Sequence, residues 1–252
     1  MAEELLRRRL ITVLTLNDGV LFRTKQFHPD YRYTLNFVDA WSVDEVVALD
    51  VTREGQGDRA AFLEVIEHLA RECFVPLACG GGVRSIDDVQ TLLRAGADKV
   101  IINTAAVERP EFITEIAELY GAQCVVVSID ARRADDGRYE VMTRFGANPT
   151  GLDPAAWAAR AQKLGAGEIF LTAIERDGSL EGYDNTLNRM VADAVSIPVL
   201  VAGGAGNWQH FHDAFLEGHA SAVCTTNIYH FTETSIRSAK RYLSDAGILV
   251  RT

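Results

Sequence analysis

Hydrophobic positions fall into short continuous runs that alternate with stretches of helical periodicity. Eight apolar runs, rich in Val, Ile and Leu, have the length of buried strands: residues 10–16, 43–51, 75–81, 99–105, 124–130, 168–174, 197–203 and 221–227. Between most of them, apolar residues recur at a helical spacing, at residues 59–72, 85–97, 110–121, 153–166 and 208–218. Strands that alternate with helices predict an α/β fold with a parallel sheet.

The length of the chain favours closure of that sheet. A chain of 252 residues without an obvious linker fits one (β/α)8 TIM barrel spanning residues 1–252. An open, doubly wound sheet is the alternative, but it calls for a dinucleotide fingerprint or a strand-order switch, and the sequence offers neither.

The sequence also repeats itself. The segment ACGGGV returns as VAGGAG, which places Gly80 and Gly203 123 positions apart. The segment VALDVTREG returns as LTAIERDG at the same distance. We therefore predict two fused half-barrel repeats, at about residues 5–120 and 121–245.

Charge and cysteine content narrow the function classes. The net charge is −10 and the pI is about 5.1, which argues against a nucleic-acid or anionic-membrane surface because such surfaces need a basic face. A small phosphorylated ligand remains compatible, since backbone N–H groups can bind a phosphate. No apolar run reaches the ~20 residues of a membrane span, and no signal peptide is evident. Four cysteines without CxxC spacing indicate free thiols, so we expect a cytoplasmic protein.

Two glycine-rich turns follow the third and seventh predicted strands. Glycine lets backbone N–H groups approach an anion without a Cβ in the way, and the helix that follows adds a favourable dipole. A tight turn without a ligand is the alternative for either turn alone. Their symmetric placement predicts two phosphate sites, the first at Gly81, Gly82, Asn103 and Thr104, and the second at Asp177, Gly178, Gly203, Gly204 and Asn227.

Acidic residues follow the strands at the same end of the barrel. Asp130 ends the fifth strand, where a carboxylate can act as general acid or base or can simply cap a loop. Asp50 and Asp177 follow the second and sixth strands. His210 and His212 diverge on a predicted helix, so we expect no metal site, and no feature calls for a cofactor.

The segments GGGVRS, GADKVIINTAAVE, VVVSIDARR, GAGEIFLTAIERDGSLEGYD and AGGAG resemble the cyclase subunit of imidazole glycerol phosphate synthase along nearly the whole chain. The related phosphoribosyl isomerase of histidine synthesis shares the half-barrel repeat, but IERDGSLEGYD and INTAAVE are closer to the cyclase. The resemblance implies a barrel that receives ammonia from a glutaminase subunit. In the family, that ammonia reacts with a bis-phosphorylated ribulosyl aminoimidazole carboxamide.

The resemblance implies two catalytic aspartates, and the sequence retains one. The second matches Asp130, whereas the first falls on Thr15, whose hydroxyl has no usable pKa near neutrality. The family's lysine after the first turn is replaced by Arg23. We expect Arg23, Asp50 and Thr172 to complete the substrate site.

The opposite end of the barrel matches the family more closely. The resemblance places two basic and two acidic residues in a ring that gates ammonia entry, at Arg9, Glu45, Lys99 and Glu168. Asp98 matches a residue that docks the glutaminase. A purely structural salt-bridge cluster is the alternative, since buried charges need partners wherever they occur.

An intact ammonia entrance combined with an altered catalytic face leaves three hypotheses. The first is a specialised paralogue that works with a glutaminase on another acceptor, similar to subunits of amidino-sugar formation on bacterial surface polysaccharides. The second is an authentic histidine-pathway cyclase that relies on Asp130. The third is a non-catalytic scaffold that activates a glutaminase.

Overall fold

The computed structural model describes residues 7–32, 43–53, 56–72, 74–225 and 236–251, with residues 22–25 and 28–32 described by their backbone alone. Among these residues there is no helix of the length and apolarity needed to cross a membrane.

Eight parallel strands close into a barrel, which confirms the predicted fold class. They are β1 (Arg9–Asn17), β4 (Glu45–Asp50), β5 (Leu77–Gly80), β6 (Lys99–Ile102), β7 (Val125–Arg133), β10 (Glu168–Ala173), β11 (Val199–Ala202) and β12 (Ala222–Thr225). Hydrogen bonds connect them in this order, and pairing of β12 with β1 closes the circle. Each predicted apolar run forms one of these strands. The run 99–105 ends early as a strand, because the chain turns at Asn103 into a helix.

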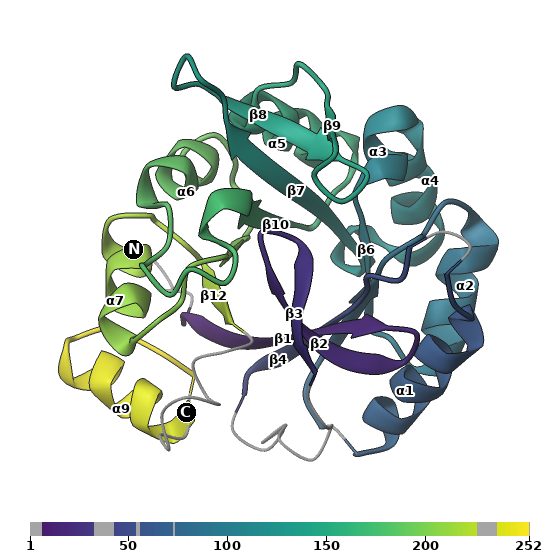
Figure 1. The fold of residues 1–252 in the computed structure, drawn as a ribbon, viewed down its shortest axis with the longest axis horizontal. Helices are drawn as coiled ribbons and strands as arrows, with labels where there is room; N and C mark the ends of the chain where they lie inside the picture. Colours follow the sequence, from purple (N-terminus) through teal and green to yellow (C-terminus); the bar gives the residue numbers. More distant parts are fainter. Residues whose placement is uncertain (1–6, 33–42, 54–55, 73, 226–235, 252) are drawn as a thin grey trace.

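Helices surround the barrel (Figure 1). They are α1 (Arg59–Glu72), α2 (Ile86–Ala95), α3 (Thr104–Glu108), α4 (Glu111–Tyr120), α5 (Pro154–Leu164), α6 (Asn185–Ala192), α7 (Trp208–Leu216) and α9 (Ile236–Asp245), with 3-10 turns η2 (Ala122–Cys124) and η3 (Ile174–Arg176). All five predicted helical stretches contain a helix. In α1, Phe62, Ile66 and Leu69 are buried at the spacing expected for one helix face.

Two β-hairpins extend the barrel at the ends of its first and fifth strands. The first comprises β2 (Val20–Lys25) and β3 (His28–Arg32), and the second comprises β8 (Tyr139–Thr143) and β9 (Asn148–Pro149). A tight turn follows β1, with positive φ angles of 51° and 70° at Asp18 and Gly19. In Figure 1 the first hairpin, drawn in purple, lies across the centre of the barrel.

The core has two apolar layers, one between barrel and helices and one inside the barrel. The inner layer consists of Ile11, Val13, Val47, Ala78, Ile101, Val126, Phe170, Leu200, Ala222 and Cys224. It fills the middle of the barrel, as side chains of a closed eight-stranded barrel do. The buried cysteines Cys79, Cys124 and Cys224 are free thiols, as predicted, and Cys73 lies outside the described residues.

A capping box fixes the start of α2, which follows the first glycine-rich turn. The Ser85 hydroxyl accepts the Asp88 N–H at 3.2 Å, and the Asp88 carboxylate accepts the Ser85 N–H at 3.0 Å. We expect Ser85→Ala to lower the free energy of unfolding by ~1 kcal/mol, because an orphan helix N–H loses its acceptor. Urea denaturation would measure this loss, and Ser85→Thr should retain most of the stability. An unchanged midpoint in Ser85→Ala would contradict the role of the cap.

Candidate functional site

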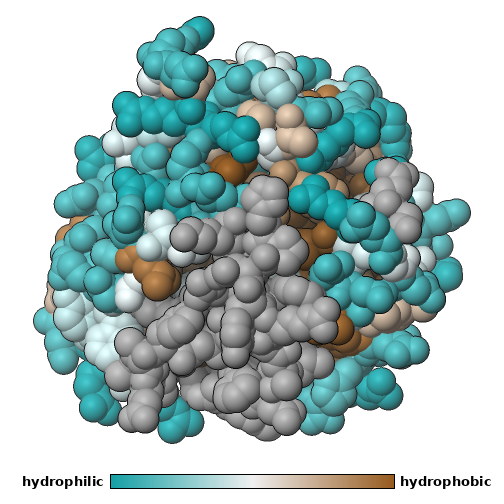
Figure 2. Space-filling model, viewed as in Figure 1, coloured by the Kyte–Doolittle hydropathy of each residue, from teal (hydrophilic) through white to brown (hydrophobic). Residues whose placement is uncertain are grey.

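A cavity of about 880 Å³ opens at the end of the barrel where the parallel strands finish. Twelve residues expected at the site line it: Thr15, Asp50, Gly81, Gly82, Asn103, Thr104, Asp130, Thr172, Asp177, Gly178, Gly203 and Gly204. The side chain of Arg23 and the whole of Asn227 lie outside the described part of the chain. Figure 2 shows apolar patches enclosed by hydrophilic residues around the centre of the face that carries the first hairpin.

Asp130 lies on β7 where that strand enters the cavity, and one of its oxygens accepts a hydrogen bond from the Asn103 amide at 2.7 Å. Burial raises the pKa of the Asp130 carboxyl to about 7. The Asn103 hydrogen bond opposes this rise, and the negative charge of Asp177 adds to it. A carboxyl that titrates near neutral pH can both donate and accept a proton under working conditions.

Thr15 occupies the position in the first half that Asp130 occupies in the second. Thr15 pairs with Leu49 of the next barrel strand, and Asp130 pairs with Thr172. Leu49 and Thr172 are 123 positions apart, the same step that separates the repeated motifs. Each residue also pairs with the first strand of the hairpin that follows it. Thr15 therefore presents a neutral hydroxyl where strict repetition would place a carboxylate.

Close backbone approaches account for the glycines of the first turn. Gly81 has a φ of 100°, and a Cβ there would lie 2.1 Å from the Asp50 carbonyl oxygen. Gly82 has a φ of 63°. The Arg59 guanidinium covers this turn, and its Nη1 donates to the Gly81 carbonyl oxygen at 2.9 Å. The turn is thus held by the end of β4 on one side and by α1 on the other.

The second turn is built in the same way with different neighbours. Gly203 and Gly204 have φ angles of 91° and 102°, and a Cβ on Gly204 would lie 2.1 Å from the Gly182 carbonyl oxygen. The Gly206 N–H donates to His210 Nδ1 at 3.1 Å, which fixes the start of α7. Both turns therefore lie next to the cavity.

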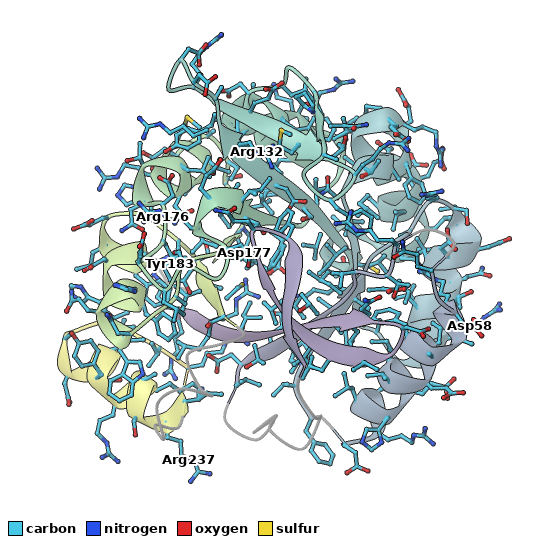
Figure 3. The ribbon with its side chains drawn as sticks, in the orientation of Figure 1. Asp58, Arg132, Arg176, Asp177, Tyr183 and Arg237 are labelled. Atoms are coloured by element: carbon cyan, nitrogen blue, oxygen red, sulfur yellow. The ribbon has the colours of Figure 1, made fainter. Side chains whose placement is uncertain are left out.

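The tip of the first hairpin contacts the second-turn side of the cavity. The Phe27 N–H donates to the Asp177 carboxylate at 3.1 Å, and the Gln26 N–H donates to the Asp177 carbonyl oxygen at 3.2 Å. In Figure 3, Asp177 lies beside this tip. Phe27 and Phe145 both line the cavity, and the Arg53 guanidinium stacks 4.0 Å from the centre of the Phe145 ring.

Sequence reasoning did not single out the residues that the hairpins and loops bring over the cavity. Those that line it are Phe27, Arg53, Arg59, Arg84, Arg144 and Phe145. The density of arginines after the second, third and fifth strands was the available signal. It could have indicated that cations gather at the strand ends.

At the opposite end of the barrel, the four residues predicted as a gate form a closed ring of ion pairs. Arg9 contacts Glu45 at 2.7 Å and Glu168 at 2.8 Å. Lys99 contacts the same two carboxylates at 2.9 Å and 2.8 Å. None of these side chains is more than 16% exposed, so each charge depends on its two partners.

Cys224 lies between this ring and the cavity. Its thiol belongs to the inner apolar layer and lines the cavity, and it is close enough to all four ring residues to interact with their charges. Burial raises the pKa of the Cys224 thiol. Asp98 precedes the ring residue Lys99 in the chain. Its carboxylate accepts a hydrogen bond from the Leu77 N–H at 2.8 Å.

Within the part of the chain that the structure describes, no group of three or more His, Cys, Asp or Glu side chains is placed to hold a metal ion. The cavity combines a carboxyl with a raised pKa, two glycine-rich turns and several arginines.

Comparison with known protein families gives a match over almost the entire barrel. The model of the histidine biosynthesis protein family covers residues 11–235, a span that includes the cavity and all eight barrel strands apart from the first residues of β1. Members of the family are TIM-barrel enzymes of the isomerase or cyclase type. The chain accordingly belongs to the histidine biosynthesis protein family.

Proposed function

We propose that this protein is a cytoplasmic cyclase-type subunit that takes ammonia from a glutaminase partner and delivers it to a phosphorylated acceptor. The ring of Arg9, Glu45, Lys99 and Glu168 is the observation that carries this proposal. A closed ring of two cations and two anions at the strand-start end can change its pairing without leaving a charge unpaired. An ordinary apolar plug would close the barrel at lower desolvation cost.

The position of Cys224 supports a route along the barrel axis. Its thiol interacts electrostatically with the ring charges on one side, and the residue lines the cavity on the other. Small side chains of the inner layer, including Ala78 and Ala222, leave less bulk there than Leu or Phe would. Ammonia that passed the ring would have to cross the apolar layer that fills the middle of the barrel, and it would reach the cavity without first mixing with bulk water.

We propose that Asp130 transfers protons in the reaction and that the two glycine-rich turns bind anionic groups of the acceptor. Thr15 supports an acceptor that differs from that of the histidine pathway, because it stands at the position of the first of the family's two catalytic aspartates. We therefore favour a specialised paralogue that acts in a pathway of amidino-sugar formation. An authentic histidine-pathway cyclase is the second candidate, supported by the pKa of about 7 at Asp130.

The proposal can be tested by pairing the purified protein with a cognate glutaminase. We expect a stable complex by size-exclusion chromatography and faster glutamine hydrolysis than the glutaminase shows alone. The histidine-pathway intermediate should turn over poorly with glutamine or with ammonium. If the protein neither binds the glutaminase nor stimulates it, the ammonia-delivery proposal is contradicted. Stimulation without any product from a panel of phosphorylated acceptors would favour the scaffold.

A substitution in the ring should uncouple ammonia transfer from glutamine hydrolysis. Lys99→Met leaves Glu45 and Glu168 with one cation between them, so we expect ammonia transfer per glutamine hydrolysed to fall by at least half. Breaking such buried pairs also costs ~3–5 kcal/mol of stability. The ratio of product to glutamate, measured at a temperature where the variant is folded, would report the uncoupling.

Lys240→Met is a matched control for this change. Lys240 is also 16% exposed and bonds a buried carboxylate, Asp44, at 2.7 Å, but it lies outside the ring. We expect Lys240→Met to lose stability and to retain the product-to-glutamate ratio. Equal ratios in both variants would show that the ring is structural only.

A further inference from the structure

The fifth barrel strand, β7, changes from apolar to polar where it enters the cavity. Alternate residues of a strand share a face, so the side chains of Val126, Ser128 and Asp130 all point into the barrel. Val126 belongs to the inner apolar layer, whereas Ser128 and Asp130 line the cavity. Ser128 is therefore the first polar side chain of β7 on the cavity side of that layer.

The first half of the barrel has no such hydroxyl. Thr15 and Asp130 are 115 positions apart, and so are Val13 and Ser128. Val13 belongs to the inner apolar layer and also lines the cavity. The floor of the cavity is thus apolar next to Thr15 and polar next to Asp130, so the repeat by itself does not account for Ser128.

The Ser128 hydroxyl has no partner within the described part of the chain. Ser128 is only 7% exposed, and none of the hydrogen bonds of the described residues involves its side chain. A buried hydroxyl usually finds a partner in the protein or in ordered water. An open hydroxyl that faces a cavity is therefore available to a ligand.

Asn103 brings a second open oxygen to the same place. The register of β6 and β7 pairs Ile102 with Val127, so Asn103, the next residue, lies beside Ser128. Asn103 Nδ2 donates to one oxygen of Asp130 at 2.7 Å, and Asn103 Oδ1 is buried without a donor among the described residues. The other oxygen of Asp130 also lacks a donor there.

The chemistry of these three oxygens restricts what can bind between them. An amide oxygen and a carboxylate oxygen only accept hydrogen bonds, and a hydroxyl can accept one as well. The site therefore calls for a small molecule that donates several hydrogen bonds, and it does not suit the oxygens of a phosphate. Ammonia donates three. It would also arrive here first, because Ser128 lies directly beyond the apolar layer that separates the cavity from the ring.

Three other carboxylates line the cavity, and each is already engaged. Glu108 of α3 pairs with Arg144 at 2.7 Å, and Asp50, at the end of β4, accepts a backbone N–H at 3.0 Å. Asp177 follows η3 and accepts an N–H from the tip of the first hairpin at 3.1 Å. All three stand at or beyond the strand ends, whereas Asp130 lies within its strand. A molecule that comes from the barrel interior thus meets Asp130 before the other acids.

We propose that Asn103 Oδ1, Ser128 Oγ and the second oxygen of Asp130 form a binding site for ammonia, which holds the nucleophile on the Asp130 side of the cavity until the acceptor reacts with it. This inference deepens the proposed function and rests on it for the supply of ammonia. Each oxygen accepts one N–H, so the nitrogen lone pair points away from the floor and toward the acceptor. Asp130 is then in contact with the nitrogen whose protons it has to receive.

The test is a titration of the full chain with ammonium chloride above pH 7, where the Asp130 carboxyl is ionised. NMR follows the side-chain amide of Asn103, and we expect a saturable shift. Tetramethylammonium chloride carries the same charge without N–H donors and should not shift this signal. Ser128→Ala should raise the ammonium concentration at half-saturation by roughly 3- to 10-fold, the usual effect of losing one hydrogen bond.

Two further variants separate ammonia binding from packing. Ser128→Thr keeps the hydroxyl and should retain the ammonium response. Thr225→Val removes another hydroxyl that lines the cavity and is only 5% exposed, but it does so on β12, and it should leave the response unchanged. No saturable shift in the wild type, an equal response to both salts, or an unchanged half-saturation in Ser128→Ala would overturn the inference.

Steady-state kinetics distinguish ammonia from a hydroxyl group of the acceptor as the occupant. With the histidine-pathway intermediate as acceptor, Ser128→Ala should raise KM for ammonium and leave KM for the intermediate unchanged. The opposite pattern would assign Ser128 to acceptor binding and overturn the inference. The ammonium titration needs no glutaminase, so a missing glutaminase complex would contradict only the proposed delivery. A complex that stimulates glutamine hydrolysis, without any ammonium response at Asn103, would contradict only this site.

Discussion

Replacing Asp130 by asparagine is expected to lower ammonia-dependent product formation by ~10²–10⁴-fold, the usual contribution of a positioned general acid or base. Asparagine keeps the shape and the hydrogen-bonding capacity toward Asn103 but cannot titrate. Because Asp130 lies at the cavity and the ring lies at the opposite end of the barrel, the variant should still bind a glutaminase and stimulate it. Loss of both activities together would indicate a folding defect instead.

The pH dependence of the wild type follows from the pKa of about 7 at Asp130. If the carboxylate accepts the proton in the slow step, the rate should rise through pH 7, and if the carboxyl donates it, the rate should fall there. In either case Asp130→Asn should remove that limb of the profile. A carbon NMR titration of the Asp130 carboxyl measures the same pKa without any acceptor, and a value near 4 would contradict the raised pKa.

The same pKa has a consequence for stability. The aspartate side chain ionises near pH 3.8 in the unfolded chain and near pH 7 in the folded one. Between these values the folded state binds more protons, so the contribution of Asp130 to stability is present below pH 3.8 and is lost as the pH rises to 7. Asp177→Asn removes one cause of the raised pKa, and it should move the midpoint of the Asp130 titration to lower pH.

The barrel was predictable from sequence because each of its strands is an apolar run of fitting length. Residues 124–130 and 168–174, for example, contain an almost unbroken series of β-branched and other apolar residues, and both form strands buried on two faces. The short hairpins were less predictable. Residues 139–143 and 148–149 are brief and partly exposed, so they carry little periodic signal of their own.

The residues of the candidate site also differ in how well the sequence predicts them. Asp130 and the glycine turns were predictable because strand ends meet at one face of a barrel. The positions of Arg59, Phe27 and Phe145 depend on how helices and loops far apart in sequence meet above that face. Arg59, for example, precedes the turn that it contacts by more than twenty residues. A repeat suggests equal sites, and only the packing shows where the halves diverged.

The expected behaviour of Thr15 decides between the two enzyme hypotheses. With a hydroxyl in place of the first catalytic aspartate, the wild type should turn over the histidine-pathway intermediate slowly even at saturating ammonium. Thr15→Asp places a carboxylate at the position that corresponds to Asp130 in the other half, and it should raise that rate toward the ~10²–10⁴-fold contribution of such a group. The side chain is only 8% exposed, so the variant should also lose stability as the pH rises and the new carboxyl ionises.

Thr15→Asn is the matched control, because it has the size of aspartate without the titratable group. We expect it to leave the slow rate unchanged, so that a gain in Thr15→Asp alone can be attributed to proton transfer. Steady-state assays with purified intermediate and ammonium would give both values. Wild-type turnover as fast as that of a two-aspartate cyclase, abolished by Asp130→Asn, would show that one carboxylate is sufficient in this cavity. That result would contradict the hypothesis of an altered acceptor and would assign the protein to histidine synthesis.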